Sequence, residues 1–380
     1  MPARRTKVSY DLIIIGGGIA GSAAALRAAQ NHLKVAWVLG DKTTAKRSRG
    51  LWVANIDNMV GIHDGIVKEK LLKALKGERF QEAREVLQQL PPQPISTRDL
   101  IRNTQQRIQE EFSDFVDEYG KVADSVEREG ENGPFRVRGK DLDLSAPFMI
   151  LATGVMDRQP IVRKTHKGEE VAQPNWVYPF ANRESFLYCL RCEGHLTSGS
   201  KTAVIGHGES AAQLAMMLHE RYESVCCVLT NGEAPAWKPE SQRLLDQYGV
   251  GVHRQAIVDL QGRAGDLHAI VLEDGKEVPV SFALVSLGLY RVYNELACQL
   301  NAELADPGQP EDERHVLISH KGETSVPGLF SVGDMTKRQG EPVMKQVYTA
   351  QEYAVRAVDT IDSRLRAARR SAVLAESGQV

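Results

Sequence analysis

The sequence predicts an α/β fold with two dinucleotide-binding domains of the Rossmann-like, three-layer type. Two glycine-rich turns, at residues 16–21 and 206–211, each join a short apolar strand to a helix, and this arrangement is typical of a dinucleotide site. A Cys-x-x-Cys pair, Cys189 and Cys192, lies just before the second turn. Thiols at this spacing can close a small ring and exchange with a partner disulfide. The chain therefore combines a redox group with cofactor-binding turns.

Composition and length agree with this prediction and argue against other classes. The chain has 380 residues, of which 42% are hydrophobic, and this is enough for two buried cores. A net charge of −2 argues against a nucleic-acid-binding protein. Five cysteines are too few for a disulfide scaffold. Residues 1–10 lack the apolar stretch of a signal peptide, and no apolar run approaches the ~20 residues of a membrane span, so a cytoplasmic location is expected.

The first turn follows an apolar run at 8–15, which is typical of a buried parallel strand, and precedes an alanine-rich helix at 22–29. Its glycines would let the backbone approach a pyrophosphate, and the helix N-terminus would supply N–H groups. The candidate residues in this turn are Gly16, Gly18, Ile19, Ala20 and Gly21. A purely structural turn is the alternative, but the flanking strand and helix favour a cofactor. After the next strand, at 34–39, Asp41 is the acid expected to bind a ribose hydroxyl.

The rest of the first half supplies further helices and strands. Residues 65–90 follow a helical pattern, and a second helix is expected from 97 to about 119. Short strands are expected over 121–144, and an apolar strand at 148–154 ends in Ala-Thr-Gly. The stretch 159–187 has few helix signals and is expected to cross between the domains.

The second half repeats the order of strand, glycine turn and helix. Its expected elements are strands at 201–205, 225–229, 283–288 and 327–332, and helices at 210–221 and 343–370. Gly333-Asp334 follows the last of these strands. Cys226 and Cys227 lie in an apolar strand and, like Cys298, are expected to pack rather than to react.

Five landmarks stand in one order along the chain: Gly16-x-Gly18-x-x-Gly21, Ala152-Thr153-Gly154, Cys189-x-x-Cys192-Glu193-Gly194, Gly206-x-Gly208-x-x-Ala211 and Gly333-Asp334. Together they resemble the low-molecular-weight thioredoxin reductases, over nearly the whole chain except about residues 62–95 and the C-terminal tail. The resemblance implies an FAD-binding domain made of residues 1–157 and 288–365. It also implies a second dinucleotide-binding domain inserted at 158–287, which carries the cysteine pair, a basic tail at 366–380, and a homodimer.

The resemblance also assigns roles to residues. Cys189 and Cys192 match the active disulfide, and Glu193 matches the acidic residue that moves protons to and from those thiols. Lys345 replaces the family's arginine at the isoalloxazine. The residues expected at the FAD are Gly16, Gly18, Ile19, Ala20, Gly21, Asp41, Asn58, Val122, Ala152, Thr153, Gly154, Gly333, Asp334, Lys345, Gln346 and Val347.

Other interpretations of the cysteines remain. Haem attachment would need a histidine where Glu193 stands. A zinc site built on Cys189, Cys192 and His195 lacks a fourth ligand at a usual spacing, and no metal is expected. The pair could be a structural disulfide, and Glu193 could be only a turn residue. Spacing and context favour redox use.

The chain departs from NADPH-using members at the end of the second strand of the inserted domain. Those members carry His-Arg-Arg, whose guanidinium groups pair with the 2′-phosphate. This chain has Leu229-Thr230-Asn231 there, and Glu233 would repel a phosphate. After Gly288 it has Leu289-Tyr290-Arg291 where the family has His-Ser-Pro. NADPH is therefore not expected.

Among relatives without that signature, the chain resembles the diflavin-linked disulfide oxidoreductases of oxygenic photosynthetic bacteria. This implies a second FAD in the former NADPH site, so two FAD per chain, and electrons that run from thiols to flavin. The residues expected at the second FAD are Gly206, His207, Gly208, Glu209, Ser210, Ala211, Thr230, Asn231 and Tyr290. Tyr290 and Tyr293 could stack on a flat ring, although aromatic residues need no ligand. Glu233 keeps NADH open as an alternative.

Several functions therefore remain beside this one. They are an ordinary thioredoxin reductase with altered nucleotide preference, a ferredoxin-dependent flavin thioredoxin reductase, a thiol oxidase of the gliotoxin-pathway type, and a flavin-binding redox sensor or scaffold. The partner is expected to be a small dithiol or a protein thiol or disulfide, and the sequence names neither it nor the final electron acceptor. The tail arginines could touch an anionic membrane surface, although a solvated helix end is the simpler interpretation. They are Arg364, Arg366, Arg369 and Arg370.

Overall fold

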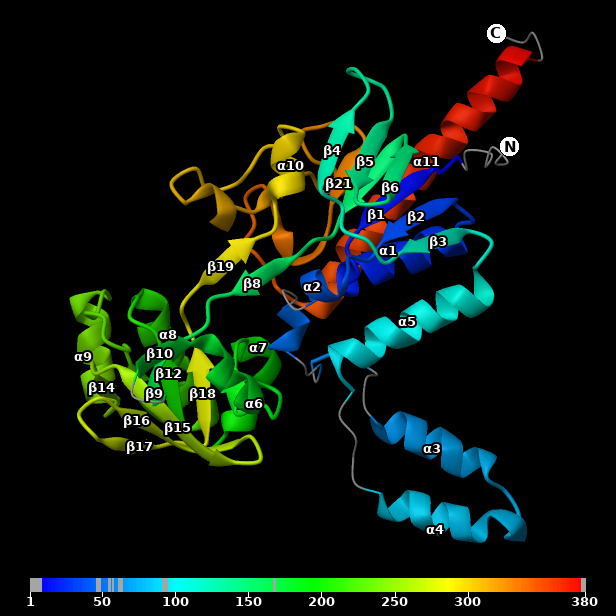
Figure 1. The fold of residues 1–380 in the computed structure, drawn as a ribbon. Coiled ribbons are helices and arrows are strands. Elements are labelled where there is room, and N and C mark those ends of the chain that lie inside the picture. Colours follow the sequence, from blue (N-terminus) through cyan, green and yellow to red (C-terminus); the bar gives the residue numbers. More distant parts are fainter. Residues whose placement is uncertain are drawn as a thin grey trace. The chain divides into compact units, whose positions relative to one another are not determined.

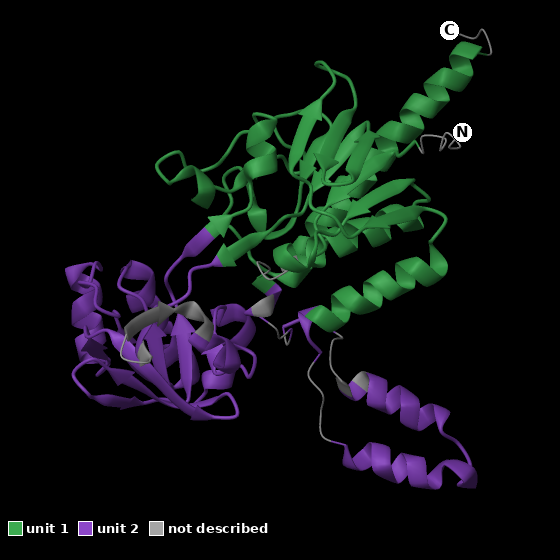
Figure 2. Cartoon of the chain, viewed as in Figure 1, with its two compact units in different colours: residues 1–49, 98–156, 291–380 green, residues 50–97, 157–290 purple. Residues whose placement is uncertain are grey.

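The computed structural model describes residues 9–45, 49–53, 56, 58–60, 64–90, 95–166 and 169–376. These residues form two compact units (Figure 2). Unit 1 comprises the described residues of 1–49, 98–156 and 291–380, and unit 2 comprises those of 50–97 and 157–290. Much of the N-terminal stretch that bears on a signal peptide lies outside the described residues.

Unit 1 is built on a parallel sheet in the order β21-β7-β1-β2-β3 (Figure 1). Its strands are β1 (Leu12–Ile15), β2 (Val35–Val38), β3 (Val116–Tyr119), β7 (Phe148–Leu151) and β21 (Leu329–Ser331). Every residue of β1 and β2 is buried, which is why these strands read as continuous apolar runs. Two helices cover one face of the sheet and contact each other, α1 (Ile19–Gln30) and α11 (Val347–Glu376).

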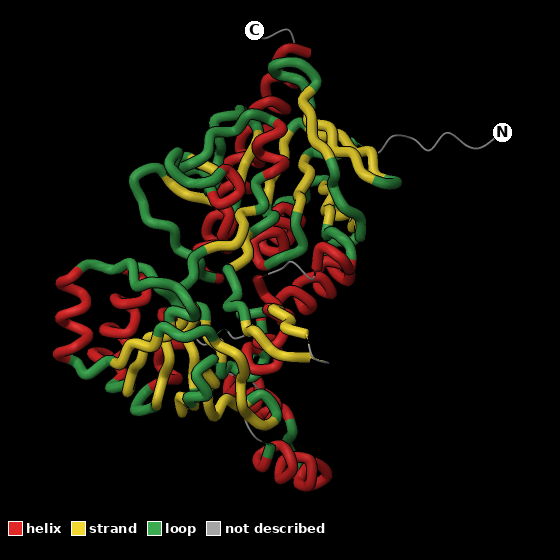
Figure 3. The backbone as a smooth tube through the Cα atoms, turned by 60° about the vertical axis from the view of Figure 1, so that its left-hand side comes forward, coloured by secondary structure: helices red, strands yellow, loops and turns green. Residues whose placement is uncertain are grey.

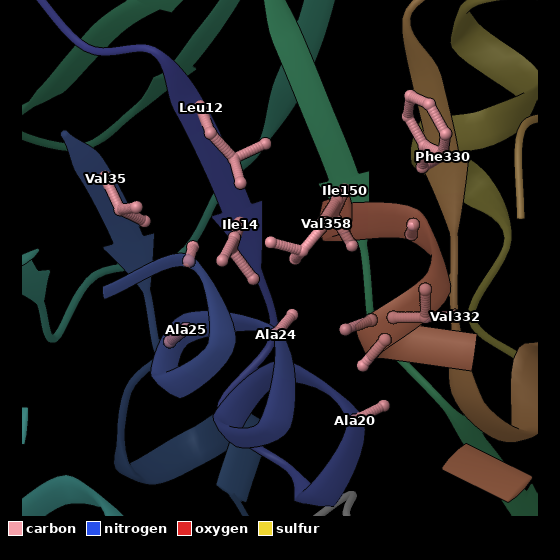
Figure 4. Packing of buried hydrophobic residues seen from close by; sticks show 14 of the residues in the cluster. Leu12, Ile14, Ala20, Ala24, Ala25, Val35, Ile150, Phe330, Val332 and Val358 are labelled. Atoms are coloured by element: carbon pink, nitrogen blue, oxygen red, sulfur yellow. The ribbon is translucent and has the colours of Figure 1, made fainter. Parts of the chain in front are cut away.

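The core of unit 1 lies between this sheet and the two helices. In Figure 4 the side chains of Ile14, Ile150 and Val358 lie close together, with Ala24 of α1 beside them. Four small buried residues of α1 allow the helix to approach the sheet closely: Ala24, Ala25, Ala28 and Ala29. An antiparallel sheet of β4 (Ser125–Arg128), β5 (Phe135–Gly139) and β6 (Leu142–Ala146) also belongs to unit 1.

Unit 1 also holds α2 (Lys42–Ala45), α5 (Thr97–Glu111) from residue 98 on, α10 (Glu295–Gln299), η5 (Glu311–Glu313), β20 (Val316–Ile318), η6 (Gly333–Met335) and β22 (Thr336–Arg338). Element η1 (Arg49–Leu51) crosses the boundary, since Arg49 belongs to unit 1 and the next two residues to unit 2. Strands β20 and β22 pair in parallel. Element η6 directly follows β21, so it lies at the carboxyl end of the main sheet.

Unit 2 has a second parallel sheet, in the order β11-β18-β12-β13-β14. Its strands are β11 (Phe186–Leu187), β12 (Lys201–Ile205), β13 (Val225–Leu229), β14 (Gly251–His253) and β18 (Phe282–Val285). Helix α8 (Glu209–Tyr222) packs on this sheet through Ala211, Ala212 and Ala215, and contacts α9 (Pro239–Gln247). In both units helices lie against the strands (Figure 3). The predicted α/β fold with two dinucleotide-binding sheets is confirmed.

Unit 2 also holds smaller elements. An antiparallel sheet joins β15 (Ile257–Arg263), β16 (Asp266–Leu272) and β17 (Glu277–Pro279), and a hairpin joins β9 (Val162–His166) to β10 (Glu169–Gln173). The helical elements are α3 (Asp64–Ala74), η2 (Glu78–Phe80), α4 (Gln81–Gln89), η3 (Pro174–Val177), α6 (Tyr178–Ala181), α7 (Leu190–Glu193) and η4 (Gly194–Thr197). The chain passes from one unit to the other along β8 (Val155–Asp157) and returns along β19 (Leu289–Val292), and these strands pair.

Several elements differ from the expectation. The helix expected up to residue 119 ends at Glu111, because the chain then turns back and Val116 begins an edge strand paired with β2. The helical pattern of 65–90 is two helices, interrupted near Gly77, whose φ is +93°. The stretch 159–187 forms a hairpin, short helices and β11 instead of a simple crossing. In the part of the chain that is described, no helix combines the length and apolar character that a membrane span requires.

Candidate active site

The cysteine pair forms a disulfide in the structure. Cys189 caps the N-terminus of α7, and its Sγ accepts the backbone N–H of Cys192 at 3.2 Å. The two residues are 9% and 8% exposed, so the disulfide is largely buried. A hydrogen bond to Sγ favours negative charge on that sulfur, so this N–H would stabilise a thiolate at Cys189.

Glu193 lies directly at this disulfide. Its side chain is buried, and Oε2 accepts the backbone N–H groups of Tyr188 at 3.0 Å and of Cys189 at 3.2 Å. The carboxylate therefore closes the turn that presents the cysteines and also lies beside the first of them. Both interpretations of this residue, as a turn residue and as an acid or base, are compatible with this position.

Tyr188, which directly precedes Cys189, interacts with three residues that no sequence motif contains: Gln159, Asp157 and Trp52. Buried Tyr188 donates its hydroxyl to Gln159 Oε1, and burial, followed by the charges of Asp157 and Glu193, raises its pKa well above the ordinary value. Asp157 is itself only 5% exposed. The ring of Trp52 meets that of Tyr188 edge-on, with centroids 6.2 Å apart. Only Tyr188 carried a signal, since it directly precedes Cys189.

The first glycine turn has the geometry of a pyrophosphate site. Gly16 has φ +134°, and a Cβ there would lie 2.2 Å from the carbonyl oxygen of Ala152. A Cβ on Gly21 would lie 1.9 Å from the carbonyl oxygen of Gly16, so α1 begins in close contact with the strand end. At Gly18, by contrast, a Cβ would meet nothing within 4 Å. The turn therefore leaves open space in front of the α1 N-terminus, as a bound pyrophosphate requires.

Residues expected at the FAD from other parts of unit 1 meet at the same sheet edge. Gly333 has φ +79°, and a Cβ there would lie 2.7 Å from Cβ of Ala20. The Thr153 hydroxyl donates to the carbonyl oxygen of Tyr293 at 2.5 Å, and its oxygen lies 3.1 Å from the sulfur of Met335. Gly154 follows with φ +77°. Asp334 forms an ion pair with Arg49, with 3.2 Å between Nη1 and Oδ2.

Asp41 has a local role in the structure. Its Oδ1 accepts the backbone N–H groups of Thr43 and Thr44, each at 2.9 Å, and the Thr43 hydroxyl at 2.6 Å. These hydrogen bonds hold the pKa of Asp41 at about 2 and cap the short helix α2. A contact between Asp41 and a ribose remains a prediction.

The last expected FAD residues lie before α11 and in two loops. Gln346 is buried and donates to the carbonyl oxygen of Lys345 at 2.8 Å, and Val347 begins the helix. Val122 lies in a loop with its carbonyl oxygen against Gly139, and half-buried Asn58 belongs to unit 2. Their roles at the flavin remain predictions.

The second glycine turn repeats the geometry of the first. A Cβ on Gly206 would lie 2.4 Å from the carbonyl oxygen of Ser286, whereas a Cβ on Gly208 would meet nothing within 4 Å. The hydroxyl of Ser210, on the first turn of α8, lies 3.0 Å from that of Ser286. The carbonyl of His207 accepts the N–H of Ala236 at 2.7 Å. Open space in front of α8 therefore remains on one side of the turn.

Glu209 makes hydrogen bonds within the chain, and its contact with a cofactor remains a prediction. Its carboxylate accepts the backbone N–H of Lys238 at 2.8 Å, the amide of Gln213 at 3.0 Å and the hydroxyl of Ser241 at 2.7 Å. These bonds lower its pKa to about 2. Glu209 therefore joins α8 to the start of α9, which is a structural task.

The end of β13 is also occupied by the chain's own hydrogen bonds. The Thr230 hydroxyl donates to the carbonyl oxygen of Glu233 at 2.6 Å. Asn231, at φ +56°, donates to the carbonyl oxygen of Ile161 at 2.9 Å and accepts the N–H of Ile257 at 2.7 Å. The side chains of Thr230 and Asn231 therefore stabilise the turn after β13, and their contact with a cofactor remains a prediction.

One cation comes near the end of β13 from another strand. The N–H of Gly232 donates to the carbonyl oxygen of Arg254 at 2.9 Å, and Arg254 is exposed. Arg254 follows β14. A search for phosphate-binding cations among the residues just after β13 therefore does not find it. Tyr290, 61% exposed, lies on β19.

The other cysteines and the tail complete the predicted sites. Burial raises the pKa of Cys226 and Cys227 to about 12, and it also raises the pKa of Cys298. None of these three thiols therefore favours the thiolate form. Among the described residues, no three histidine, cysteine or acidic side chains gather as a metal site would require. Three arginines of α11 form ion pairs, two of them with residues outside the helix: Arg364 with Glu323, Arg366 with Asp362, and Arg369 with Asp11.

Comparisons with known proteins agree with this geometry. The family model described as "Pyridine nucleotide-disulphide oxidoreductase" matches residues 10–354. One alkyl hydroperoxide reductase subunit, that of Pseudomonas putida, is 24% identical over 342 residues, which is 87% of this chain and 54% of that protein. Thioredoxin reductase of Coxiella burnetii is 24% identical over 352 residues, 90% of this chain and 92% of that protein. The chain thus spans about half the length of the Pseudomonas putida protein.

A solved structure, thioredoxin reductase from Streptococcus pyogenes, is similar to the chain with a TM-score of 0.70 at 19% identity, over 95% of this chain and all of the other. This similarity concerns the fold. The family model covers most of the sequence, including both glycine turns and the disulfide. The chain therefore belongs to the pyridine nucleotide-disulphide oxidoreductase family.

Proposed function

We propose that this enzyme couples the Cys189–Cys192 pair to FAD without a pyridine nucleotide, that it holds a second FAD at the second glycine turn, and that electrons run from a thiol partner to flavin. One observation carries the proposal. The turn at Gly206 and Gly208 keeps the open space of a pyrophosphate site, whereas the strand end beside it, at Thr230 and Asn231, is closed by the chain's own hydrogen bonds. A dinucleotide without a 2′-phosphate fits that combination.

The first FAD would be held at the edge of the unit 1 sheet. Gly16, Gly18 and the N-terminus of α1 would face its pyrophosphate, and Gly333-Asp334 would face the ribityl chain. Bound FAD supplies an acceptor for two electrons. The open position at Gly18 and the close packing of Gly333 on Ala20 support this assignment.

The disulfide exchanges with the partner in two steps. A partner thiolate attacks one sulfur of the pair, so the S–S bond breaks and a mixed disulfide forms. A second partner thiolate then attacks the partner's sulfur in this mixed disulfide and releases the enzyme's cysteine, so Cys189 and Cys192 are left as thiols and the partner becomes a disulfide, oxidised by two electrons. The hydrogen bond that the Cys192 N–H donates to Cys189 Sγ favours Cys189 as the thiolate in this exchange.

Reoxidation of the pair releases two electrons and two protons. We propose that Glu193, whose carboxylate accepts the backbone N–H of Cys189, takes one of these protons. Neighbouring Tyr188 stays protonated, because burial and the charges of Asp157 and Glu193 raise its pKa. We propose that Tyr188 and Trp52 pack around the disulfide and keep water from it.

A second candidate is an NADPH-dependent thioredoxin reductase. The names of the relatives and the exposed Arg254 beside Gly232 favour it. The partner in either case would be a protein or small-molecule thiol or disulfide, and the homodimer and cytoplasmic location expected from the sequence remain proposals.

An anaerobic reduction experiment separates the two candidates. We expect a dithiol such as dihydrolipoamide or dithiothreitol to bleach the flavin absorbance, and micromolar NADPH to leave it unchanged. Cys189→Ser and Cys192→Ser should each keep FAD but lose bleaching by the dithiol, and Cys227→Ser, whose thiol has a pKa of about 12, is the matched control. Bleaching by dithiol at the wild-type rate in either site variant would refute the redox role of the pair.

A further inference from the structure

We propose that Arg49 is the charge partner of Asp334 at the first FAD site, where it orients the Asp334 carboxylate toward the flavin and cancels its charge beside the pyrophosphate. This inference rests on the proposed role of Asp334. No sequence motif contains Arg49, and the two residues are 285 positions apart.

The ion pair between them is sheltered. Arg49 Nη1 lies 3.2 Å from Asp334 Oδ2, and the two side chains are only 13% and 20% exposed. Most ion pairs of the described residues are more open than this one, for example Arg27–Asp359 at 36% and 44%. A sheltered pair is screened less by solvent and salt, so its charges act more strongly on neighbouring groups.

The pair lies at the edge that carries the first glycine turn. Val332 donates its N–H to the carbonyl oxygen of Leu151, which puts the end of β21 next to the end of β7. Gly333 then passes so close to Ala20 that a Cβ would lie 2.7 Å from the Ala20 Cβ. Asp334 is the next residue, and Ala20 is the second residue of α1. Arg49 therefore brings a guanidinium to the start of α1.

Charge explains why a cation is needed there. A pyrophosphate carries negative charge, and a carboxylate close to it would oppose binding unless a cation compensates. Arginine suits the task, because its planar fork can hold one carboxylate oxygen and still present other N–H donors. With Arg49 in place, the charge of the Asp334 carboxylate is compensated, so a pyrophosphate beside it would be repelled less.

The test is a double-mutant cycle with FAD affinity as the readout. Dissociation of FAD from the purified protein would be measured by equilibrium dialysis for Arg49→Met, Asp334→Asn and the double variant. Loss of a charged hydrogen bond should weaken FAD binding about tenfold or more in each single variant. The double variant should be no weaker than Asp334→Asn, since the proposal has Arg49 act on FAD binding through the Asp334 carboxylate. Arg27→Met removes an ion pair at the other end of α1 and should leave the FAD affinity unchanged.

The outcomes separate the inference from the proposed function. If Asp334→Asn leaves FAD affinity unchanged, the proposed role of Asp334 fails, and the inference fails with it. If Asp334→Asn weakens binding but Arg49→Met does not, or if the two losses multiply in the double variant, the inference alone is overturned. Arg49→Lys retains the charge and should stay within about fivefold of wild type. A lysine variant with a native circular dichroism spectrum that binds FAD as weakly as Arg49→Met would also overturn it.

Discussion

Replacement of Asn231 by alanine tests whether the end of β13 is closed by the protein itself. The side chain makes two hydrogen bonds, to the carbonyl oxygen of Ile161 at 2.9 Å and from the N–H of Ile257 at 2.7 Å. Each contributes about 1 kcal/mol. Asn231 also has φ +56°, a conformation that alanine adopts less readily, at a cost of about 1 kcal/mol. We therefore expect Asn231→Ala to lower the free energy of unfolding of unit 2 by about 2–4 kcal/mol.

Urea unfolding followed by circular dichroism measures this effect. Asn231→Gly should be less destabilised than Asn231→Ala, because glycine removes the backbone cost while losing the same hydrogen bonds. The number of bound FAD molecules in folded protein should not change in either variant. An alanine variant as stable as wild type to within ~0.5 kcal/mol, but with less FAD bound, would show that Asn231 is a ligand residue and that this reasoning is wrong.

Two further predictions concern Arg254 and His315. Arg254→Ala should leave flavin reduction by NADPH as slow as in wild type. The chain lacks the two arginines that hold the 2′-phosphate in NADPH-using members, and the loss of two such contacts weakens NADPH binding on the order of a hundredfold. If the wild type is instead reduced rapidly by NADPH and Arg254→Ala abolishes that reduction, Arg254 is the cation that binds the 2′-phosphate. Burial, with the charge of Lys345, lowers the pKa of His315 from 6.5 to about 4, so the unfolded chain binds a proton first as pH falls. The free energy of unfolding of wild type relative to His315→Gln should fall by roughly 3 kcal/mol between pH 8 and 4, and a constant difference would contradict the buried neutral state.

The parts of the fold that were predictable depend on local sequence. The two turns require glycine, because a Cβ on Gly16 or Gly206 would collide with a carbonyl oxygen at the end of the neighbouring strand. Apolar runs such as β1 and β12 mark strands buried by their neighbours. The Cys-x-x-Cys spacing likewise placed the disulfide. In these places one short segment contains the whole signal.

The unpredicted parts depend on residues that are distant in sequence. Helix α5 ends before Val116 because the chain from Val116 on pairs with β2 as strand β3. Local helix propensity does not reveal this pairing. Trp52 reaches Tyr188, and Arg49 reaches Asp334, across more than a hundred residues. Arg254 comes near the end of β13 only through pairing of β13 with β14. Contacts of this kind follow no fixed sequence spacing, so a single sequence does not reveal them.

The number of FAD molecules per chain tests the central claim most directly. Protein purified with FAD in excess would be denatured, and the released FAD counted against protein. We expect two per chain in wild type, and one in Gly208→Val or in Gly18→Val, because each valine fills the open space of one turn at a backbone conformation that a side chain tolerates. A reproducible ratio of one in wild type, unchanged by Gly208→Val, would contradict the second FAD site.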